Sequence, residues 1–168
     1  TIRGNRCAGI MDYFGTSVVQ DNDFSQSGAD ALTASIVAYY SGGSVISNNR
    51  FTDAQLPYEQ VTESVSDDQT IRIVYDVTQG FDVYARETPS VQIQNNTFLQ
   101  GTNGIYLSGS EGSIENNQWT DYLQRPIGVY DSEGVDIIGN EISGFGYYGI
   151  YCSQAQVDID TGNFEEGG

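Results

Sequence analysis

The sequence contains no histidine and no lysine, and its six arginines stand against 23 acidic residues, which gives a formal net charge of −17. Nucleic acids and anionic membranes bind proteins mainly through Lys and Arg, so this charge excludes both as partners. The lack of histidine removes the commonest general base and argues against zinc, copper and haem centres. Neutral or cationic partners fit the composition better.

Long apolar runs and cysteine are scarce as well. No stretch approaches the ~18 apolar residues of a membrane-spanning helix, and no basic, apolar signal segment opens the chain, so we expect no membrane insertion. The two cysteines, Cys7 and Cys152, lie near opposite ends and do not match a disulfide framework or a metal cluster. Because the chain begins at Thr1 rather than at a methionine, we expect a processed or excised segment.

One short phrase recurs along the chain. Each copy places an aliphatic residue, an asparagine three positions later and a large apolar residue two positions after that. The copies are VQDNDF (19–24), ISNNRF (46–51), IQNNTF (93–98), IENNQW (114–119) and IIGNEI (137–142), with weaker copies IRGNRC (2–7) and IDTGNF (159–164). Counted between the asparagines of successive copies, from Asn22 to Gly162, which replaces asparagine in the last copy, the spacings are 27, 47, 21, 23 and 22 residues. All but the second are therefore one period.

A second short apolar run precedes each asparagine by about twelve residues. The central residues of these runs are Ile10, Val37, Val83, Ile105, Val129 and Ile150. Each period thus holds at least two short strands separated by Gly, Ser, Asn and Asp turns. Helical repeats need long amphipathic stretches and propeller blades need about 40 residues, so the sequence predicts an all-β parallel solenoid of about six or seven coils.

Stacking of coils explains the repeated asparagine. Equivalent residues of successive coils lie about 4.8 Å apart in a parallel solenoid. An asparagine at a bend tolerates the left-handed backbone conformation, and its amide can both donate and accept along a column of equivalent turns. We therefore expect an asparagine ladder at one corner, with the aliphatic and aromatic columns filling the interior. Cys7 falls in the aromatic column and is expected to be a small core residue.

These repeats resemble the right-handed parallel β-helix repeats of the pectate lyase-like superfamily, in particular the NosD and carbohydrate-active type with asparagine ladders. The resemblance covers nearly the whole chain and implies a right-handed parallel β-helix that is secreted or at the cell surface. The same superfamily includes polysaccharide lyases, epimerases and glycoside hydrolases as well as tailspikes and surface proteins. The motif set of polygalacturonases is missing, and YYGIYC (147–152) shares only the tyrosine-glycine start of the alginate epimerase motif.

We expect a single domain, residues 1–168, that is a segment of a longer solenoid. The chain starts inside one repeat and stops soon after another without an amphipathic capping helix, so flanking domains of the same chain or end-to-end self-association should cover its ends. The double spacing encloses residues 52–80, where no asparagine phrase survives. This stretch is either an insertion that leaves the cylinder, which we favour, or a degenerate coil.

Tyrosines follow the second apolar run in successive coils. If the central residues of these runs point inward, their next neighbours point outward. The outward tyrosines are then Tyr84, Tyr106, Tyr130 and Tyr151. Such a stripe could bind a neutral polysaccharide through ring faces and hydroxyls, or it could simply stabilise neighbouring strands, and the sequence leaves both interpretations open.

Few residues are candidates for catalysis. Asp82, Arg86 and Asp131 lie close to the tyrosines in sequence, and two carboxylates can act as acid and base on a glycosidic bond. Two coils separate Asp82 from Asp131, which is about 10 Å and exceeds the ~5 to 9.5 Å that such a pair requires. Solvated turn carboxylates are the alternative interpretation.

No cofactor is expected. Acidic pairs such as Asp21 with Asp23, Asp67 with Asp68 and Asp158 with Asp160 could hold calcium, but none lies in a calcium-binding loop motif. The leading functional hypothesis is therefore a noncatalytic scaffold or polysaccharide-binding module. The alternatives are a polysaccharide lyase, epimerase or glycosidase, and a structural stalk or assembly unit.

Overall fold

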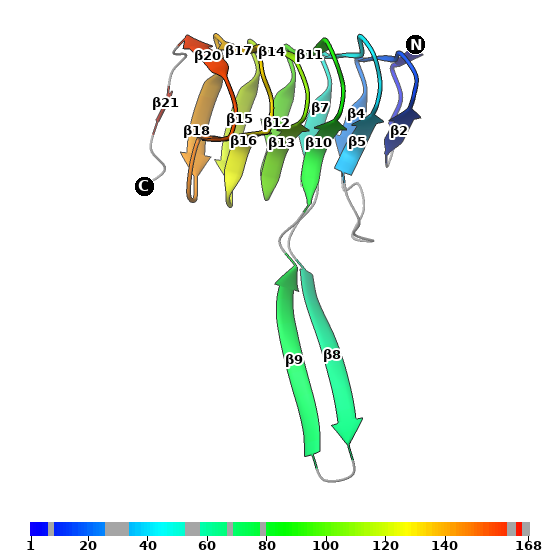
Figure 1. The fold of residues 1–168 in the computed structure, drawn as a ribbon, viewed down its shortest axis with the longest axis vertical. Coiled ribbons are helices and arrows are strands. Elements are labelled where there is room, and N and C mark those ends of the chain that lie inside the picture. Colours follow the sequence, from blue (N-terminus) through cyan, green and yellow to red (C-terminus); the bar gives the residue numbers. More distant parts are fainter. Residues whose placement is uncertain are drawn as a thin grey trace.

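The computed structural model describes residues 1–6, 9–25, 34–52, 58–66, 69–77, 80–160 and 164–165, with backbone alone for residues 25, 58–66, 69–77 and 164–165. The described chain is all-β and contains no helix. Its strands form three parallel sheets of seven, six and six strands, in which neighbouring strands come from successive coils. Figure 1 shows the resulting stack, with β2 and β20 at opposite ends. The predicted parallel β-solenoid is confirmed.

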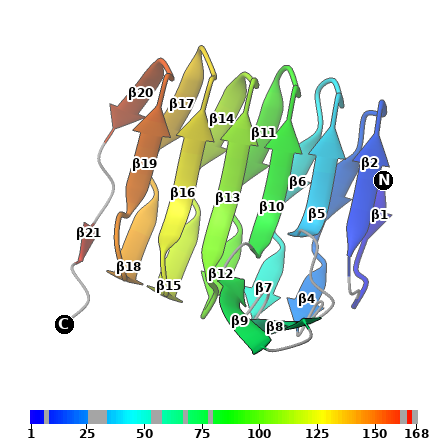
Figure 2. The same ribbon diagram turned by 60° about the horizontal axis from the view of Figure 1, so that its bottom comes forward.

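We call the three parallel sheets A, B and C. Each coil contributes one strand to each of them, and the chain passes through them in the order C, A, B. Sheet A holds β1 (Ile2–Arg3), β3 (Val18–Gln20), β6 (Val45–Ser47), β11 (Val91–Gln94), β14 (Gly112–Glu115), β17 (Val135–Ile138) and β20 (Val157–Asp160). Sheet B holds β4 (Asp23–Ser25), β7 (Arg50–Thr52), β12 (Thr97–Leu99), β15 (Gln118–Tyr122), β18 (Glu141–Phe145) and β21 (Phe164–Glu165). Sheet C, seen side by side in Figure 2, holds β2 (Ile10–Tyr13), β5 (Ala34–Tyr39), β10 (Phe81–Arg86), β13 (Asn103–Ser108), β16 (Arg125–Tyr130) and β19 (Ile150–Ser153).

The stack makes about five turns, slightly fewer than the six or seven expected. Strands β8 (Tyr58–Ser66) and β9 (Gln69–Val77) pair antiparallel with each other and form a sheet of their own. Strand β5 pairs directly with β10, so no coil intervenes between them. The terminal strands add only partial turns, because β1 is the sole strand before β2 among the described residues.

The interior is filled by the two apolar columns of the repeat. The aliphatic column lies in sheet A and includes Val19, Ile46, Ile93, Ile114 and Ile137, all at most 1% exposed. The aromatic column lies in sheet B, where Phe24, Phe51, Phe98 and Trp119 are buried and stack at ring-centroid distances of 4.7 to 4.9 Å. Full burial of each such side chain stabilises the fold by about 1.5–3 kcal/mol, so these columns dominate its stability. Cys7 lies outside the described residues.

The repeated asparagines are buried at the corner between sheets A and B. The side-chain amide of each donates to the Oδ1 atom of the next, for example from Asn49 to Asn96 at 3.1 Å and from Asn96 to Asn117 at 3.0 Å. The same Oδ1 atom accepts a backbone N–H from the preceding coil, and each amide also donates to a backbone carbonyl of that coil. These bonds run from Asn5 to Asn140. Gly162 lies outside the described residues.

The left-handed backbone position is not the asparagine of the repeat but the residue before it. Positive φ angles occur at Asp21, Asn48, Asn95 and Asn116, with Gly4 and Gly139 in the same place. Asp, Asn and Gly tolerate this conformation best. The buried asparagine is instead required for its amide hydrogen bonds. The sequence interpretation had assigned both roles to one residue.

One inward residue of sheet C differs from the expectation, and another lies in a different inward column. Val83 pairs with Ile36, so Ile36 takes the inward place expected for Val37, which pairs with Tyr84. Ile105 pairs with Ile127, and Val129, which is buried as expected, pairs with Leu107 in a second inward column. Both runs contain several consecutive apolar residues, and apolar character alone cannot choose among them. This shift changes which residues share the outer surface.

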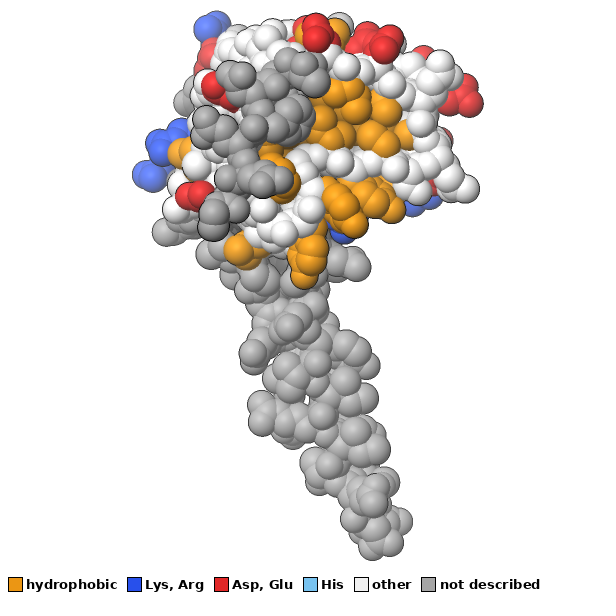
Figure 3. Space-filling model, turned by 90° about the vertical axis from the view of Figure 1, so that its left-hand side faces the viewer, with side chains coloured by type: hydrophobic (Ala, Val, Ile, Leu, Met, Phe, Trp, Pro, Cys, Tyr) orange, Lys and Arg blue, Asp and Glu red, His pale blue; other side chains and the backbone are white. Residues whose placement is uncertain are grey.

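The ends of the stack leave core residues partly covered. Ile10 at one end and Ile150 and Val157 at the other are only partly buried, and Ile159 is 45% exposed. In Figure 3, which faces the end that carries β20, hydrophobic side chains reach the surface and acidic side chains lie near the margin. The described residues include no helix that could cross a membrane.

Candidate functional site

Two columns of side chains point outward from sheet C, because residues alternate between the faces of a strand. The first outer column contains Met11, Val37, Tyr84, Tyr106, Gly128 and Tyr151. The second outer column contains Tyr13, Tyr39, Arg86, Ser108, Tyr130 and Ser153. Three of the four predicted stripe tyrosines therefore share a column, and Tyr130 belongs to the neighbouring one.

Tyr130 nevertheless joins the stack, because it reaches across Gly128. A Cβ atom on Gly128 would lie 2.9 Å from the Cε2 atom of Tyr130, so the ring covers the place where a side chain is missing. Its centroid lies 4.8 Å from that of Tyr106 and 5.5 Å from that of Tyr151. Tyr84 and Tyr106 stack at 4.8 Å with an angle of 1° between their planes. We call the four residues Tyr84, Tyr106, Tyr130 and Tyr151 the tyrosine stripe.

The rings of the tyrosine stripe are half-buried. Ring faces turn toward neighbouring rings along the stack, so these contacts hold adjacent coils together. Burial raises the pKa of Tyr130, and the charge of Arg125 opposes this effect. Burial also raises the pKa of Tyr84, while its hydrogen bond with Arg86 acts in the opposite direction. Both phenols therefore remain protonated at neutral pH and can donate hydrogen bonds to a ligand.

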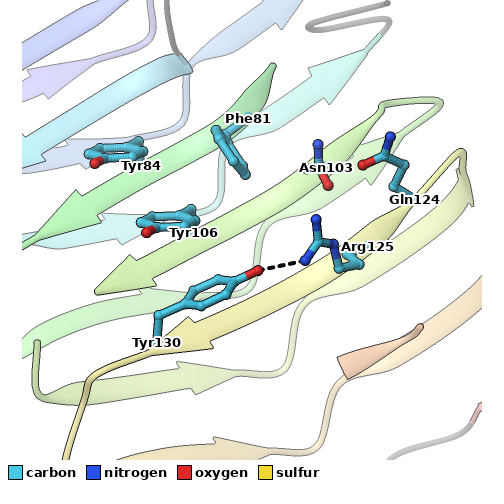
Figure 4. Close-up of a pocket in the computed structure, with 7 residues that line it drawn as sticks. All are labelled: Phe81, Tyr84, Asn103, Tyr106, Gln124, Arg125 and Tyr130. Atoms are coloured by element: carbon cyan, nitrogen blue, oxygen red, sulfur yellow. Dashed lines mark hydrogen bonds between the residues drawn. The ribbon is translucent and has the colours of Figure 1, made fainter. Parts of the chain in front are cut away.

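A groove of about 410 Å³ lies beside the tyrosine stripe (Figure 4). Its lining consists of Phe81, Tyr84, Asn103, Tyr106, Gln124, Arg125 and Tyr130. Phe81 is tilted against the stripe, with its centroid 6.0 Å from that of Tyr84 and 5.1 Å from that of Tyr106. The groove therefore combines aromatic rings with two side-chain amides and a guanidinium group.

Arg125 is held in the groove by aromatic partners. Its Nη1 atom donates to the hydroxyl of Tyr130 at 2.6 Å, the bond drawn in Figure 4, and its guanidinium lies 5.3 Å from the ring centroid of Tyr151. The salt bridges among the described residues involve Arg3 and Arg6, not Arg125. Hydrogen bonding and cation–π contact thus fix the orientation of this cation.

The candidate catalytic residues do not converge in the structure. Asp82 is fully buried and accepts a hydrogen bond from the Tyr122 hydroxyl, so it is not beside the exposed stripe as expected. Burial raises the pKa of Asp82 well above its usual range. Tyr84 points outward, so strict alternation along β10 would also point Asp82 outward. Instead Asp82 is buried, and the neighbouring Phe81 lies on the outer face against Tyr84 and Tyr106. Arg86 and Asp131 are both exposed.

Metal ligands do not cluster in the described part of the chain. No group of three or more Cys, Asp or Glu side chains there could hold a metal ion. Of the acidic pairs considered for calcium, Asp21 receives a hydrogen bond of 2.6 Å from Arg3, which lowers its pKa. Asp67 and Asp68 lie outside the described residues.

Several groove residues were missed by the sequence interpretation. Phe81, Asn103 and Gln124 lie at the starts of strands in sheet C or in the turn before them, where the repeat carries no common residue. Gly128 was the one available signal, because a glycine in an outward position leaves a gap that a neighbouring ring can fill.

A comparison with protein families gives one finding. The family model described as "Periplasmic copper-binding protein (NosD)" matches residues 14–164. No curated protein and no solved structure matches the chain.

Proposed function

The chain belongs to the NosD family, and from this premise we propose that it is a noncatalytic β-solenoid module, located outside the cytoplasm, that binds a neutral polysaccharide. The word periplasmic in the family description supports the proposed location outside the cytoplasm. The observation that carries the ligand class is the groove beside the tyrosine stripe, in which four aromatic rings lie near two amides and a guanidinium.

The groove chemistry suits an uncharged sugar. The hydroxyls of a pyranose both donate and accept hydrogen bonds, and its C–H groups can pack on the edges of the stacked tyrosine rings and on the tilted ring of Phe81. Gln124 offers an amide donor and acceptor, and the protonated hydroxyls of Tyr84 and Tyr130 add further donors. Asn103 is almost fully buried at the base of the groove and donates to the carbonyl of Gly80. A net charge of −17 repels polyanions over the surface as a whole, which favours a neutral chain.

The described residues of this chain do not fit the copper of the family description, and Cys7 lies outside them. Copper sites use imidazole, thiolate and thioether ligands, and the sequence has no histidine and one methionine. Met11 lies on β2 and Cys152 on β19, at opposite edges of sheet C. Five strand spacings separate them, or about 24 Å, so they cannot share a metal ion. No role is therefore assigned to copper here.

The proposal predicts that the double variant Tyr106→Ala with Tyr130→Ala loses polysaccharide binding. The substitutions remove two stripe rings and the hydroxyl that orients Arg125. Each aromatic contact contributes about 0.5–1.5 kcal/mol beyond area burial, so the loss of two should lower the affinity by roughly fivefold to a hundredfold. Isothermal titration or affinity electrophoresis against neutral glucans, mannans and xylans measures this loss.

Tyr147→Ala is the matched control, because this tyrosine is 71% exposed and lies outside the stripe. It should leave affinity unchanged, and circular dichroism should show that all variants remain folded. Absence of binding to every glycan tested would overturn the proposal. Release of unsaturated or reducing-end products would support an enzyme instead, and a change of oligomeric state without glycan binding would support a stalk.

A further inference from the structure

A second group of aromatic residues lies at the other end of the outer face of sheet C. Tyr13 and Tyr39 stack in the second outer column, with centroids 5.2 Å apart and planes 2° apart. Phe14 and Tyr40 follow them in the next turn and stack at 5.1 Å with planes 6° apart. Rings of successive coils are thus in register at this end as well.

These rings are exposed at a conformational cost. Phe14 is 71% exposed, Tyr13 is 56% exposed and Tyr40 is 44% exposed. Phe14 and Tyr40 also have positive φ angles of 56° and 53°. The left-handed conformation costs roughly 1–2 kcal/mol for a residue with a side chain. Neither ring is fully buried, so the hydrophobic effect does not offset this cost. Core packing therefore does not explain why aromatic residues occupy these turns.

Arg86 connects this group to the tyrosine stripe. It follows Tyr39 in the second outer column, and its guanidinium lies 5.7 Å from the Tyr39 ring centroid. The same side chain hydrogen-bonds to the hydroxyl of Tyr84, the first residue of the stripe. Every strand of sheet C therefore contributes at least one aromatic or arginine side chain to a row that crosses from the second outer column to the first at β10, where Arg86 and Tyr84 both belong to it. The row spans five strand spacings, or about 24 Å.

We propose that the polysaccharide-binding surface continues from the groove through Arg86 to Tyr39 and Tyr13, and that the ligand is a linear, uncharged chain lying along the solenoid axis. This inference rests on the proposed function and deepens it. The groove alone, at about 410 Å³, holds a short oligosaccharide. The row of side chains, repeated at the spacing of the coils, extends the contact to several further sugar units.

The experiment compares neutral oligosaccharides of two and eight units, from β-1,4-glucan, β-1,4-mannan and β-1,4-xylan, with the whole chain. For the series that binds, the eight-unit sugar should bind about tenfold more tightly than the two-unit sugar, as expected when two or three aromatic contacts are added. The double variant Tyr13→Ala with Tyr39→Ala should lose this gain and keep its affinity for the two-unit sugar, because neither residue lines the groove. Tyr13 is exposed and Tyr39 is half-buried on the outer face, so the fold should persist.

The outcomes separate the inference from the proposed function. Equal affinity for both lengths would overturn the extended surface and leave the groove as a binding site. A lack of binding by every series would overturn both. Loss of self-association in the variant, measured by sedimentation, with no change in sugar binding would show that the exposed rings form a protein interface. Tyr147→Ala, which changes an exposed ring outside the row, should alter none of these measurements.

Discussion

A carboxyl group enclosed among packed side chains must give up its charge or find strong compensation. Asp82 is fully buried, and the hydrogen bond from Tyr122 is its contact with another side chain. Burial raises the pKa of Asp82 well above the value of 3.8 that it has in an unfolded chain. Between these two pKa values the folded protein holds a proton that the unfolded chain has lost. Stability therefore falls as the pH rises through this window.

Asp82→Asn should remove this pH dependence. The neutral amide can still accept from the Tyr122 hydroxyl, and it has no proton to lose. The free energy of unfolding, measured by urea denaturation at pH 4 and pH 8, should therefore fall less with rising pH in the variant than in the parent protein. Asp131→Asn is the control, since it makes the same substitution at a carboxyl that is exposed rather than buried. An unchanged pH profile in Asp82→Asn would show that the buried carboxyl is already ionised.

Tyr130 shows how one small residue changes a surface. Gly128 leaves an empty place in the first outer column, and the Tyr130 ring enters it from the second. The hydroxyl of Tyr130 then meets Arg125, which in turn lies over Tyr151. A single glycine thus connects the tyrosine stripe to the polar side of the groove.

At the scale of elements, the column of asparagines joins the coils at their most buried corner. The Asn96 amide donates to Asn117 and to the backbone carbonyl of Ile46, and its Oδ1 atom accepts two bonds from Asn49. All four of these hydrogen bonds are buried, so water cannot replace a partner that is lost. The column therefore penalises any slip in the pairing of the coils.

Asn96→Ala should destabilise the protein strongly. The change leaves two donors of Asn49 and the carbonyl of Ile46 short of a partner, and each loss costs roughly 1–3 kcal/mol. A total loss of about 3–5 kcal/mol is expected from urea denaturation. Asn5→Ala, at the exposed end of the same column, should cost less than about 1 kcal/mol. Equal effects at both positions would mean that the column adds little to stability.

At the scale of the whole molecule, one sign of charge prevails. The net charge is −17, and the salt bridges among the described residues pair Arg3 with Asp21 and Arg6 with Asp23 at the N-terminal end of the stack. Apart from the buried Asp82, the other carboxylates of residues 9–25 and 80–160 are partly or fully exposed. Their repulsion opposes the compact state and is screened by salt over about 10 Å at 0.1 M ionic strength.

Added sodium chloride should therefore raise the melting temperature. An increase in ionic strength from about 0.01 M to about 0.3 M shortens the screening length several-fold and weakens repulsion between surface carboxylates. Differential scanning calorimetry at pH 7 should show a rise of several degrees, and the rise should shrink at pH 4, where many carboxylates are protonated. A melting temperature independent of salt would show that the surface charges lie too far apart to matter.

The repeat in the amino-acid chain was sufficient to derive the architecture. A fixed period places like residues in register, and the aliphatic and aromatic columns must be buried wherever the coils stack, so parallel pairing and the interior follow without knowledge of coordinates. The asparagine position follows in the same way, because a buried amide needs partners in the coils on either side.

Which side chains meet on the outer surface was decided only by the folded structure. A strand changes face at every residue, so an offset of one or two positions among neighbouring apolar residues decides which side chains meet outside. Ile127 is in register with Ile105, and Val129, which is also buried, pairs with Leu107 in a second inward column. Gly128 therefore lies in the first outer column and Tyr130 in the second. Asp82 turned inward against alternation because Tyr122, 40 residues later, supplies a hydroxyl there. The groove likewise joins residues from three coils, and contacts between residues so far apart in sequence exist only once the coils have stacked.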